Sequence, residues 1–169
     1  MLRSNLLEEL RIDLNIHLHI HPINMQEIYE ILGKIKTQNR RVTRARLGIL
    51  KAIFEAKKPI EIKNIKKWLR KNRIRVDRST VYRQLRYLTS KKFLNKFQIA
   101  SGRIYFEPAK GHCHHLVCIR CKDIKDISLE NCLKGQEQKI MTGCGFKVLG
   151  HTLEIYGLCK NCQQKEQSA

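Results

Sequence analysis

The seven cysteines most constrain this 169-residue chain, because all of them lie after residue 112 and four form two Cys-x2-Cys pairs. The pairs are Cys118 with Cys121 and Cys159 with Cys162. An odd cysteine count argues against a disulfide framework, whereas paired Cys-x2-Cys spacing is typical of zinc sites. The 37 residues between the pairs exceed the loop of a simple zinc ribbon, so we expect the site to clip the C-terminal tail onto an earlier strand. Four thiolates leave no open coordination position, which predicts a structural Zn²⁺.

Positive charge is concentrated in a different part of the chain. There are 34 Lys and Arg against 15 Asp and Glu, and residues 25–108 alone carry a net charge of +17. Residues 109–169 carry +3 and residues 1–24 carry −1. We therefore predict a domain for an anionic partner at 25–108 and a metal-binding domain at 109–169, with a linker marked by Pro108 and Gly111. Residues 1–24 are expected to be a disordered N-terminal extension, as terminal segments commonly are, with Met25 as an alternative start.

Composition and hydropathy exclude several classes of protein. No apolar run approaches the roughly 18 residues that a membrane span needs. Acidic residues interrupt the apolar N-terminal stretch, which is unlike a secretion signal. We therefore expect a cytoplasmic protein with an anionic partner and no membrane association.

The basic segment has the periodicity of three short helices followed by two strands. Apolar residues spaced by three or four positions predict helices at 44–56 and 61–71, and a third that begins after a cap at Asp77 or Ser79. Residues 93–99 and 103–107 are typical of two strands around a glycine-containing turn. Three helices and a terminal hairpin predict a winged helix-turn-helix, whose last helix enters the major groove of DNA.

The third predicted helix carries side chains suited to DNA opposite its apolar face. With Val81 and Leu85 inward, the outward residues of its first turns are Arg78, Ser79, Tyr82 and Arg83. These residue types contact base edges and phosphates. A second cluster is predicted to hold phosphate or to enter a narrow minor groove, and it consists of Arg40, Arg41, Arg44 and Arg46. The alternative for such charge runs is a solvated basic face.

Residues 112–115, His-Cys-His-His, form a second candidate metal motif. In a strand, His112 and His114 would share one side, and Cys113 and His115 the other. Each side offers two nitrogen or sulfur ligands and needs partners from elsewhere. His151 lies in a later strand-like run, and Glu107 and Asp126 are nearby acids.

From about Arg41 to Cys162 the chain resembles the ferric-uptake-regulator (Fur) family of bacterial metal-sensing repressors. The residues that carry the resemblance are Arg41-Val42-Thr43, Ser79-Thr80-Val81-Tyr82-Arg83, Tyr105-Phe106-Glu107, the run from His112 to Cys118 with Cys121, His151, and the Cys159/Cys162 pair. The resemblance implies an α+β fold, with an N-terminal winged helix-turn-helix DNA-binding domain followed by a small α/β dimerisation domain. It also implies metal-dependent repression by a homodimer at inverted-repeat operators in double-stranded DNA.

The resemblance further implies roles for individual residues. Cys118, Cys121, Cys159 and Cys162 fall on the family's structural zinc site. Glu107, Cys113 and His115 fall on a regulatory metal site at the hinge between domains, and His112, His114 and His151 on a further site in the dimerisation domain. Tyr82 and Arg83 fall on base-contacting positions, and Arg41 on a minor-groove position.

Departures from the family pattern bear on the sensed metal. Cys113 stands where the family usually has histidine, and a thiolate favours zinc over ferrous iron. Residues 59–61 lack the histidine usual in the iron- and peroxide-sensing branches, so a peroxide sensor is not expected. The carboxylate usual in the further site has no clear match, and Lys134 falls near its position. We therefore predict a zinc-responsive repressor with regulatory Zn²⁺, and keep Fe²⁺ as the alternative.

Two other classes of protein are alternatives to a repressor. A zinc hydrolase or deaminase needs three protein ligands, an open position and a general base, and the chain has neither His-Glu-x-x-His nor His-x-Glu with Pro-Cys-x-x-Cys. We therefore expect neither an enzyme nor a small-molecule substrate. A constitutive zinc-stabilised nucleic-acid-binding protein stays open, because it would share the charge and the cysteine pairs.

Overall fold

The computed structural model describes residues 22–109, 111, 114–129 and 132–167. The chain divides into two compact units, Met1–Ala109 and Lys110–Ala169. Of the expected N-terminal extension, residues 1–21 lie outside the described residues, and so do His112 and Cys113 of the histidine-rich motif. A helix begins at Pro22, three residues before the predicted boundary at Met25.

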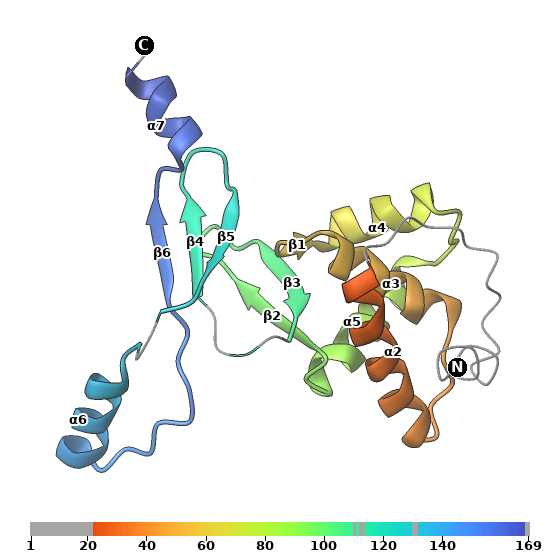
Figure 1. Cartoon of the computed structure of the whole chain (residues 1–169), viewed down its shortest axis with the longest axis horizontal. Coiled ribbons are helices and arrows are strands. Elements are labelled where there is room, and N and C mark those ends of the chain that lie inside the picture. Colours follow the sequence, from red (N-terminus) through yellow and green to blue (C-terminus); the bar gives the residue numbers. More distant parts are fainter. Residues whose placement is uncertain (1–21, 110, 112–113, 130–131, 168–169) are drawn as a thin grey trace. The chain divides into compact units, whose positions relative to one another are not determined.

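The first unit combines helices with a small antiparallel sheet (Figure 1). Its helices are α2 (Pro22–Thr37), α3 (Arg44–Glu55), α4 (Ile62–Lys71) and α5 (Arg78–Ser90). Its strands β1 (Ile60–Glu61), β2 (Leu94–Gln98) and β3 (Ile104–Pro108) have the order β1-β3-β2. The three predicted helices and two predicted strands are confirmed to within about one residue at their ends. Helix α2 and the two-residue strand β1 were not predicted.

The core of this unit follows from the helical spacing of apolar side chains. In α2 the fully buried residues are Ile28, Leu32 and Ile35, spaced by four and three positions, and they join one cluster with the inner faces of α3, α4 and α5. Gly48 of α3 allows close packing, since a Cβ there would lie 2.7 Å from Ile74 Cδ1 and 2.8 Å from Leu69 Cδ2. The buried faces therefore leave the polar faces of the helices outward.

Side-chain caps set where two of these helices begin. The hydroxyl of Thr43 accepts a hydrogen bond from Arg46 N at 3.2 Å at the start of α3. Asp77 Oδ1 accepts from Thr80 N at 2.7 Å at the start of α5. Each cap satisfies a backbone N–H that has no partner within its own helix. The caps fix the register in which α5 presents its outer face.

The second unit is a three-stranded sheet of order β5-β4-β6 with two helices. Strand β4 (His114–Cys118) pairs antiparallel with β5 (Ile124–Ile127) and parallel with β6 (Glu154–Gly157). Helix α6 (Lys134–Cys144) lies between β5 and β6 in the chain, and α7 (Lys160–Gln167) follows β6 (Figure 1). The predicted mixture of helix and sheet, an α+β fold, is confirmed. None of the described helices is long and apolar enough to cross a membrane.

Candidate metal centres and DNA-facing helix

The two Cys-x2-Cys pairs meet at one end of the second sheet. Cys118 is the last residue of β4, and Cys159 follows β6. Because β4 and β6 run parallel, with Cys118 beside Gly157, the segments that follow these strands start from the same end of the sheet. The four sulfur atoms of Cys118, Cys121, Cys159 and Cys162 all lie within 4.8 Å of one another.

The spacing of these sulfurs fits a tetrahedral zinc ion. Bonds of about 2.3 Å to a central Zn²⁺ place tetrahedral sulfurs about 3.8 Å apart. Cys121 Sγ and Cys159 Sγ are 3.7 Å apart. The donor set is the one that structural zinc sites use, and the residues present therefore fit Zn²⁺.

The protein itself favours ionisation of one thiol of this cluster and opposes that of another. The backbone N–H of Cys159 donates to Cys118 Sγ at 3.4 Å, which is the main reason that the pKa of Cys118 falls to about 6. Burial, followed by the neighbouring thiols, raises the pKa of Cys162 to about 12. Adjacent thiolates repel one another, and a divalent cation removes that repulsion. The cluster is thus built to exchange protons for a metal ion.

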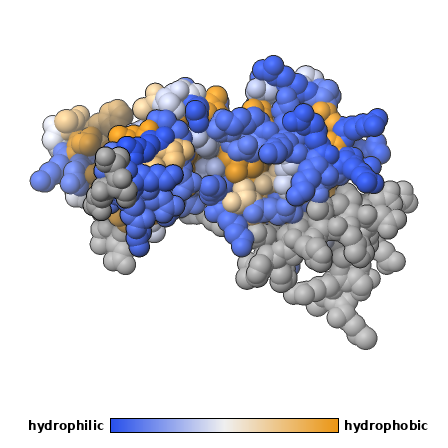
Figure 2. Space-filling model, turned by 90° about the horizontal axis from the view of Figure 1, so that it is seen from above, coloured by the Kyte–Doolittle hydropathy of each residue, from blue (hydrophilic) through white to orange (hydrophobic). Residues whose placement is uncertain are grey.

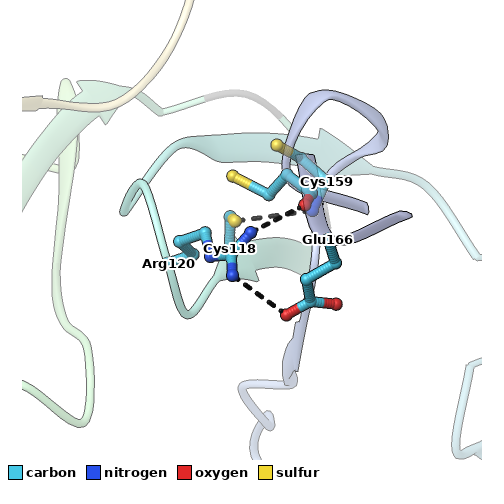
Figure 3. A network of polar contacts seen from close by, with 5 residues as sticks. Cys118, Arg120, Cys159 and Glu166 are labelled. Carbon is cyan, nitrogen blue, oxygen red and sulfur yellow. Dashed lines mark hydrogen bonds and ion pairs between the residues drawn. The ribbon is translucent and has the colours of Figure 1, made fainter. Parts of the chain in front are cut away.

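Arg120 ties the last helix to the turn between the first cysteine pair. Its Nη1 donates to the backbone oxygen of Cys162 at 3.0 Å, and its Nη2 lies 3.2 Å from Glu166 Oε1 in α7 (Figure 3). These contacts hold the Cys159–Cys162 segment against the turn after β4. They supplement the metal ligands in closing the C-terminal tail onto the sheet.

A second group of potential metal ligands surrounds His114. His114 is 1% exposed, and its ring stacks on that of His151 with centroids 5.3 Å apart and planes 19° apart. Cys132, in the turn before α6, joins them, and the three ligand atoms lie within 4.8 Å of one another. His151 Nδ1 is 2.6 Å from Glu137 Oε1 of α6.

His115 faces a different set of side chains from its neighbour His114. Its Nε2 lies 3.8 Å from Oδ1 of Asp126, the residue opposite it on β5. Glu107 belongs to β3 of the first unit, where Asn95 Nδ2 donates to its Oε1 at 3.4 Å. The predicted partner Cys113 lies outside the described residues.

Helix α5 presents a polar face to solvent. Its buried apolar residues Val81, Leu85 and Leu88 face the core, while its exposed residues are Arg78, Ser79, Tyr82, Arg83, Arg86 and Ser90. Tyr82 is 44% exposed, with the guanidinium of Arg78 5.5 Å from its ring centre. The Ser79 hydroxyl donates a hydrogen bond to Asp77 Oδ1 at 2.6 Å. Its oxygen can therefore only accept hydrogen bonds from other groups. Hydrophilic residues cover most of the molecular face displayed in Figure 2.

Arg46 corrects one expectation from the sequence. It was grouped with Arg40, Arg41 and Arg44 as a phosphate-binding residue, but it is only 7% exposed. Its Nε donates to Gln84 Oε1 of α5 at 2.9 Å, its Nη1 donates to the backbone oxygen of Arg41 at 2.6 Å, and its guanidinium lies 4.6 Å from the ring centre of Tyr87. The third residue of α3 faces the core side of that helix, so Arg46 joins α3 to α5.

Comparison with known proteins assigns the chain to a family. The profile of the Ferric uptake regulator family matches residues 37–156, which is more than half of the chain. This chain belongs to the ferric uptake regulator family. Fur-family members are metal-responsive transcription regulators and not enzymes.

Individual relatives agree with that assignment. The Fur-family chain is 26% identical over 142 residues to the ferric uptake regulation protein of Neisseria meningitidis, covering 82% of this chain and 97% of the relative. Its fold matches the Helicobacter pylori ferric uptake regulator with a TM-score of 0.69 at 18% identity, over 83% of this chain and 93% of that one. It matches the Francisella tularensis regulator, solved with iron, with a TM-score of 0.64 at 26% identity, over 72% and 93%.

Three residues that the structure places beside the predicted site residues were not predicted from the sequence. Cys132 and Glu137 are the first two: Cys132 lies in a turn, and Glu137 lies in α6, which has no buried face whose periodicity would indicate the inward side chains. Arg86 is the third, and it could have been found, since it lies three and four residues after Arg83 and Tyr82 on the same helical face.

Proposed function

We propose that this chain is a zinc-responsive transcriptional repressor that binds inverted-repeat operator DNA as a metal-loaded homodimer in the cytoplasm. The observation that carries the proposal is the outer face of α5, where Arg78, Tyr82 and Arg83 are exposed while the opposite face is buried. In this proposal α3 to α5 and the β2–β3 hairpin act as a winged helix-turn-helix, and α5 enters the major groove.

Phosphate contacts would come from the rest of the basic unit. Arg41 is exposed next to the start of α3, where its side chain can reach a minor groove. A groove of about 910 Å³ beside the start of α5 has basic walls formed by Lys66, Arg70, Arg73 and Arg75. A net charge of +17 over residues 25–108 makes the affinity for DNA strongly dependent on salt.

Three metal sites are assigned in this proposal. Cys118, Cys121, Cys159 and Cys162 hold a structural Zn²⁺, which the spacing of their sulfurs supports. Glu107, Cys113 and His115 hold the regulatory metal, and His112, His114 and His151 belong to a further site. The choice of zinc for the regulatory site rests on the thiol of Cys113, because thiolate ligands strengthen zinc binding more than ferrous binding.

A homodimer would cover apolar side chains that the single chain exposes. Strand β6 is an edge strand of its sheet, and Ile155 and Tyr156 on it are each 42% exposed. Ile140 and Met141 of α6 are also exposed. Exposed edge strands with apolar side chains are usual sites of pairing. Such pairing would bring two copies of α5 to half-sites one helical turn apart.

Regulation in this proposal is a linkage between two binding equilibria. The metal stabilises the conformation of the dimer that binds DNA relative to the conformation that does not. The size of this effect is the difference between the metal's binding free energies for the two conformations. The metal-free protein should therefore bind DNA weakly and through charge alone.

An iron-responsive repressor is the second candidate. The observation in its favour is that the relatives reported above are ferric uptake regulators, one of them solved with iron. It requires that Glu107, Cys113 and His115 select Fe²⁺ in spite of the thiol.

The test is operator affinity at buffered free Zn²⁺, Fe²⁺ and Mn²⁺ without oxygen, with an operator selected from random duplexes by the metal-loaded protein. We expect Zn²⁺ to strengthen binding most, and Arg83→Ala to abolish specific binding. Lys165→Ala removes the same charge from exposed α7 and should leave specificity unchanged. A stronger response to Fe²⁺ at cellular free-metal levels would favour the second candidate. Equal affinity of apo and loaded protein at one salt concentration would favour a constitutive binder instead.

A further inference from the structure

We propose that Cys132 is the ligand that sets the metal preference of the His114–His151 centre, and that Glu137 positions His151 for that metal. The inference rests on the proposed metal-responsive function and deepens it. It names a ligand set of two imidazoles and one thiolate, where the sequence offered only histidines.

The three ligands come from separate segments that the fold brings together. His114 is the first residue of β4, Cys132 lies in the turn before α6, and His151 precedes β6. Their ligand atoms lie within 4.8 Å of one another. Bonds of about 2.0 Å to nitrogen and 2.3 Å to sulfur require donor separations of roughly 3.3–3.8 Å. Shifts of about 1 Å in the positions of the donor atoms would therefore allow all three side chains to coordinate one ion.

Glu137 acts on His151 from outside that group. Its Oε1 lies 2.6 Å from His151 Nδ1. The carboxylate therefore accepts a hydrogen bond from Nδ1–H, which fixes the tautomer of the ring. The ring then offers Nε2 as its donor to a metal. Glu137 is accordingly a positioning residue, whereas Cys132 is a ligand.

The thiol changes which metal the centre prefers. The carboxylate usual at this site would fall near Lys134, which is exposed at the start of α6 and carries a positive charge. Sulfur from Cys132 takes the place of that oxygen donor. Carboxylate and imidazole suit ferrous and manganous ions, whereas thiolate with imidazole is a zinc donor set.

Metal binding here would also order α6. The structure describes every residue of α6, and none of these residues is buried. Cys132 and Glu137 nevertheless connect the start of this helix to β4 and to the segment before β6. Coordination of one ion by Cys132 and the two histidines would therefore tie the start of α6 to the sheet. The helix has no buried apolar residue that would do so by packing.

Cobalt substitution tests whether Cys132 is a ligand. The full chain carries Cys113→Ser throughout, so that the other predicted thiol ligand is absent, and retains zinc in the four-cysteine site. Co²⁺ is then added to the parent, to Cys132→Ser and to Cys144→Ser, whose cysteine is exposed at the end of α6. We expect a near-ultraviolet thiolate-to-cobalt band in the parent and in Cys144→Ser, and its loss in Cys132→Ser. A band that persists in Cys132→Ser, or is missing from the parent, would overturn the inference.

Chelator competition measures the two roles separately. Glu137→Ala should weaken Zn²⁺ binding by about 10- to 100-fold without removing the cobalt band, and Glu137→Gln, which keeps an acceptor oxygen, should recover part of the loss. Cys132→Asp should narrow the preference for Zn²⁺ over Mn²⁺. Circular dichroism and retained structural zinc exclude misfolding. DNA binding is measured on the chain that retains Cys113, and the cobalt band on the Cys113→Ser background. Metal-independent DNA binding with an intact cobalt band would refute the proposed function and leave Cys132 as a ligand, whereas metal-dependent DNA binding with the band unchanged in Cys132→Ser would refute only this inference.

Discussion

Replacing Arg46 by Met should destabilise the first unit without removing a DNA contact. Two hydrogen bonds from the guanidinium, to Gln84 and to the Arg41 carbonyl, are worth roughly 1.5–3 kcal/mol each because the donor is charged. The contact with Tyr87 adds about 1 kcal/mol. Burial lowers the pKa of Arg46, which reflects a desolvation cost that Met avoids. Allowing for several kcal/mol of that cost, we expect a net loss of about 2–4 kcal/mol.

Urea denaturation followed by tryptophan fluorescence measures this loss in the right unit. Trp68 is the single tryptophan of the chain, and its Nε1 donates to Glu55 Oε2 at 2.6 Å within the first unit. The midpoint of Arg46→Met should fall by roughly 1–3 M urea, for a slope typical of a unit of this size. Arg44→Met removes an exposed arginine two residues away and should change stability by less than about 0.5 kcal/mol.

The dependence of DNA affinity on salt separates the structural role of Arg46 from a phosphate contact. Loss of one phosphate contact reduces the slope of log affinity against log salt by about 0.9. We expect that reduction for Arg44→Met if it contacts phosphate, and no change of slope for Arg46→Met. A structural role for Arg46 is excluded if Arg46→Met is as stable as Arg44→Met, or if it reduces the salt slope by the amount expected for one phosphate contact.

Three further predictions concern single side chains. Cys118→Ser should release the structural zinc, lower the melting temperature and loosen the dimer, whereas Cys144→Ser should do none of these; metal analysis, thermal melts and sedimentation would show it. Hydrogen bonds from Ser79 and Thr80 hold the pKa of Asp77 below its usual value, so Asp77 stabilises the fold above about pH 4 and less as the pH falls further. The stability difference between wild type and Asp77→Asn, which caps without titrating, should therefore shrink from pH 7 to pH 3, and a constant difference would contradict this. Cys113→His should narrow the preference for Zn²⁺ over Fe²⁺ in anaerobic operator binding, and an unchanged preference would remove the thiol from the sensing site.

Local patterns in the sequence were sufficient to predict helices α3, α4 and α5. The caps at Thr43 and Asp77 and the apolar spacing of α3, α4 and α5 depend on neighbours within four positions, so their signals survive without tertiary information. The same spacing is present in α2, at Ile28, Leu32 and Ile35, so this helix too could have been predicted from the sequence. Strand β1 has two residues and exists only because Ile60 pairs with Phe106 of β3.

Local spacing is enough to identify the candidate metal ligands, since the two Cys-x2-Cys pairs and the His-Cys-His-His run are recognised without tertiary information. Which distant side chains join them depends on the tertiary structure. The parallel pairing of β4 and β6 brings Cys118 and Cys159 to one edge, and the segment crossing between β5 and β6 places Cys132 and Glu137 beside His114 and His151. The inward turn of Arg46 was decided in the same way, because a long charged side chain can serve either DNA or the core, and the nearby Gln84 and Tyr87 determine which. Contacts between segments that are far apart in the chain depend on the path of the backbone, which no local period encodes.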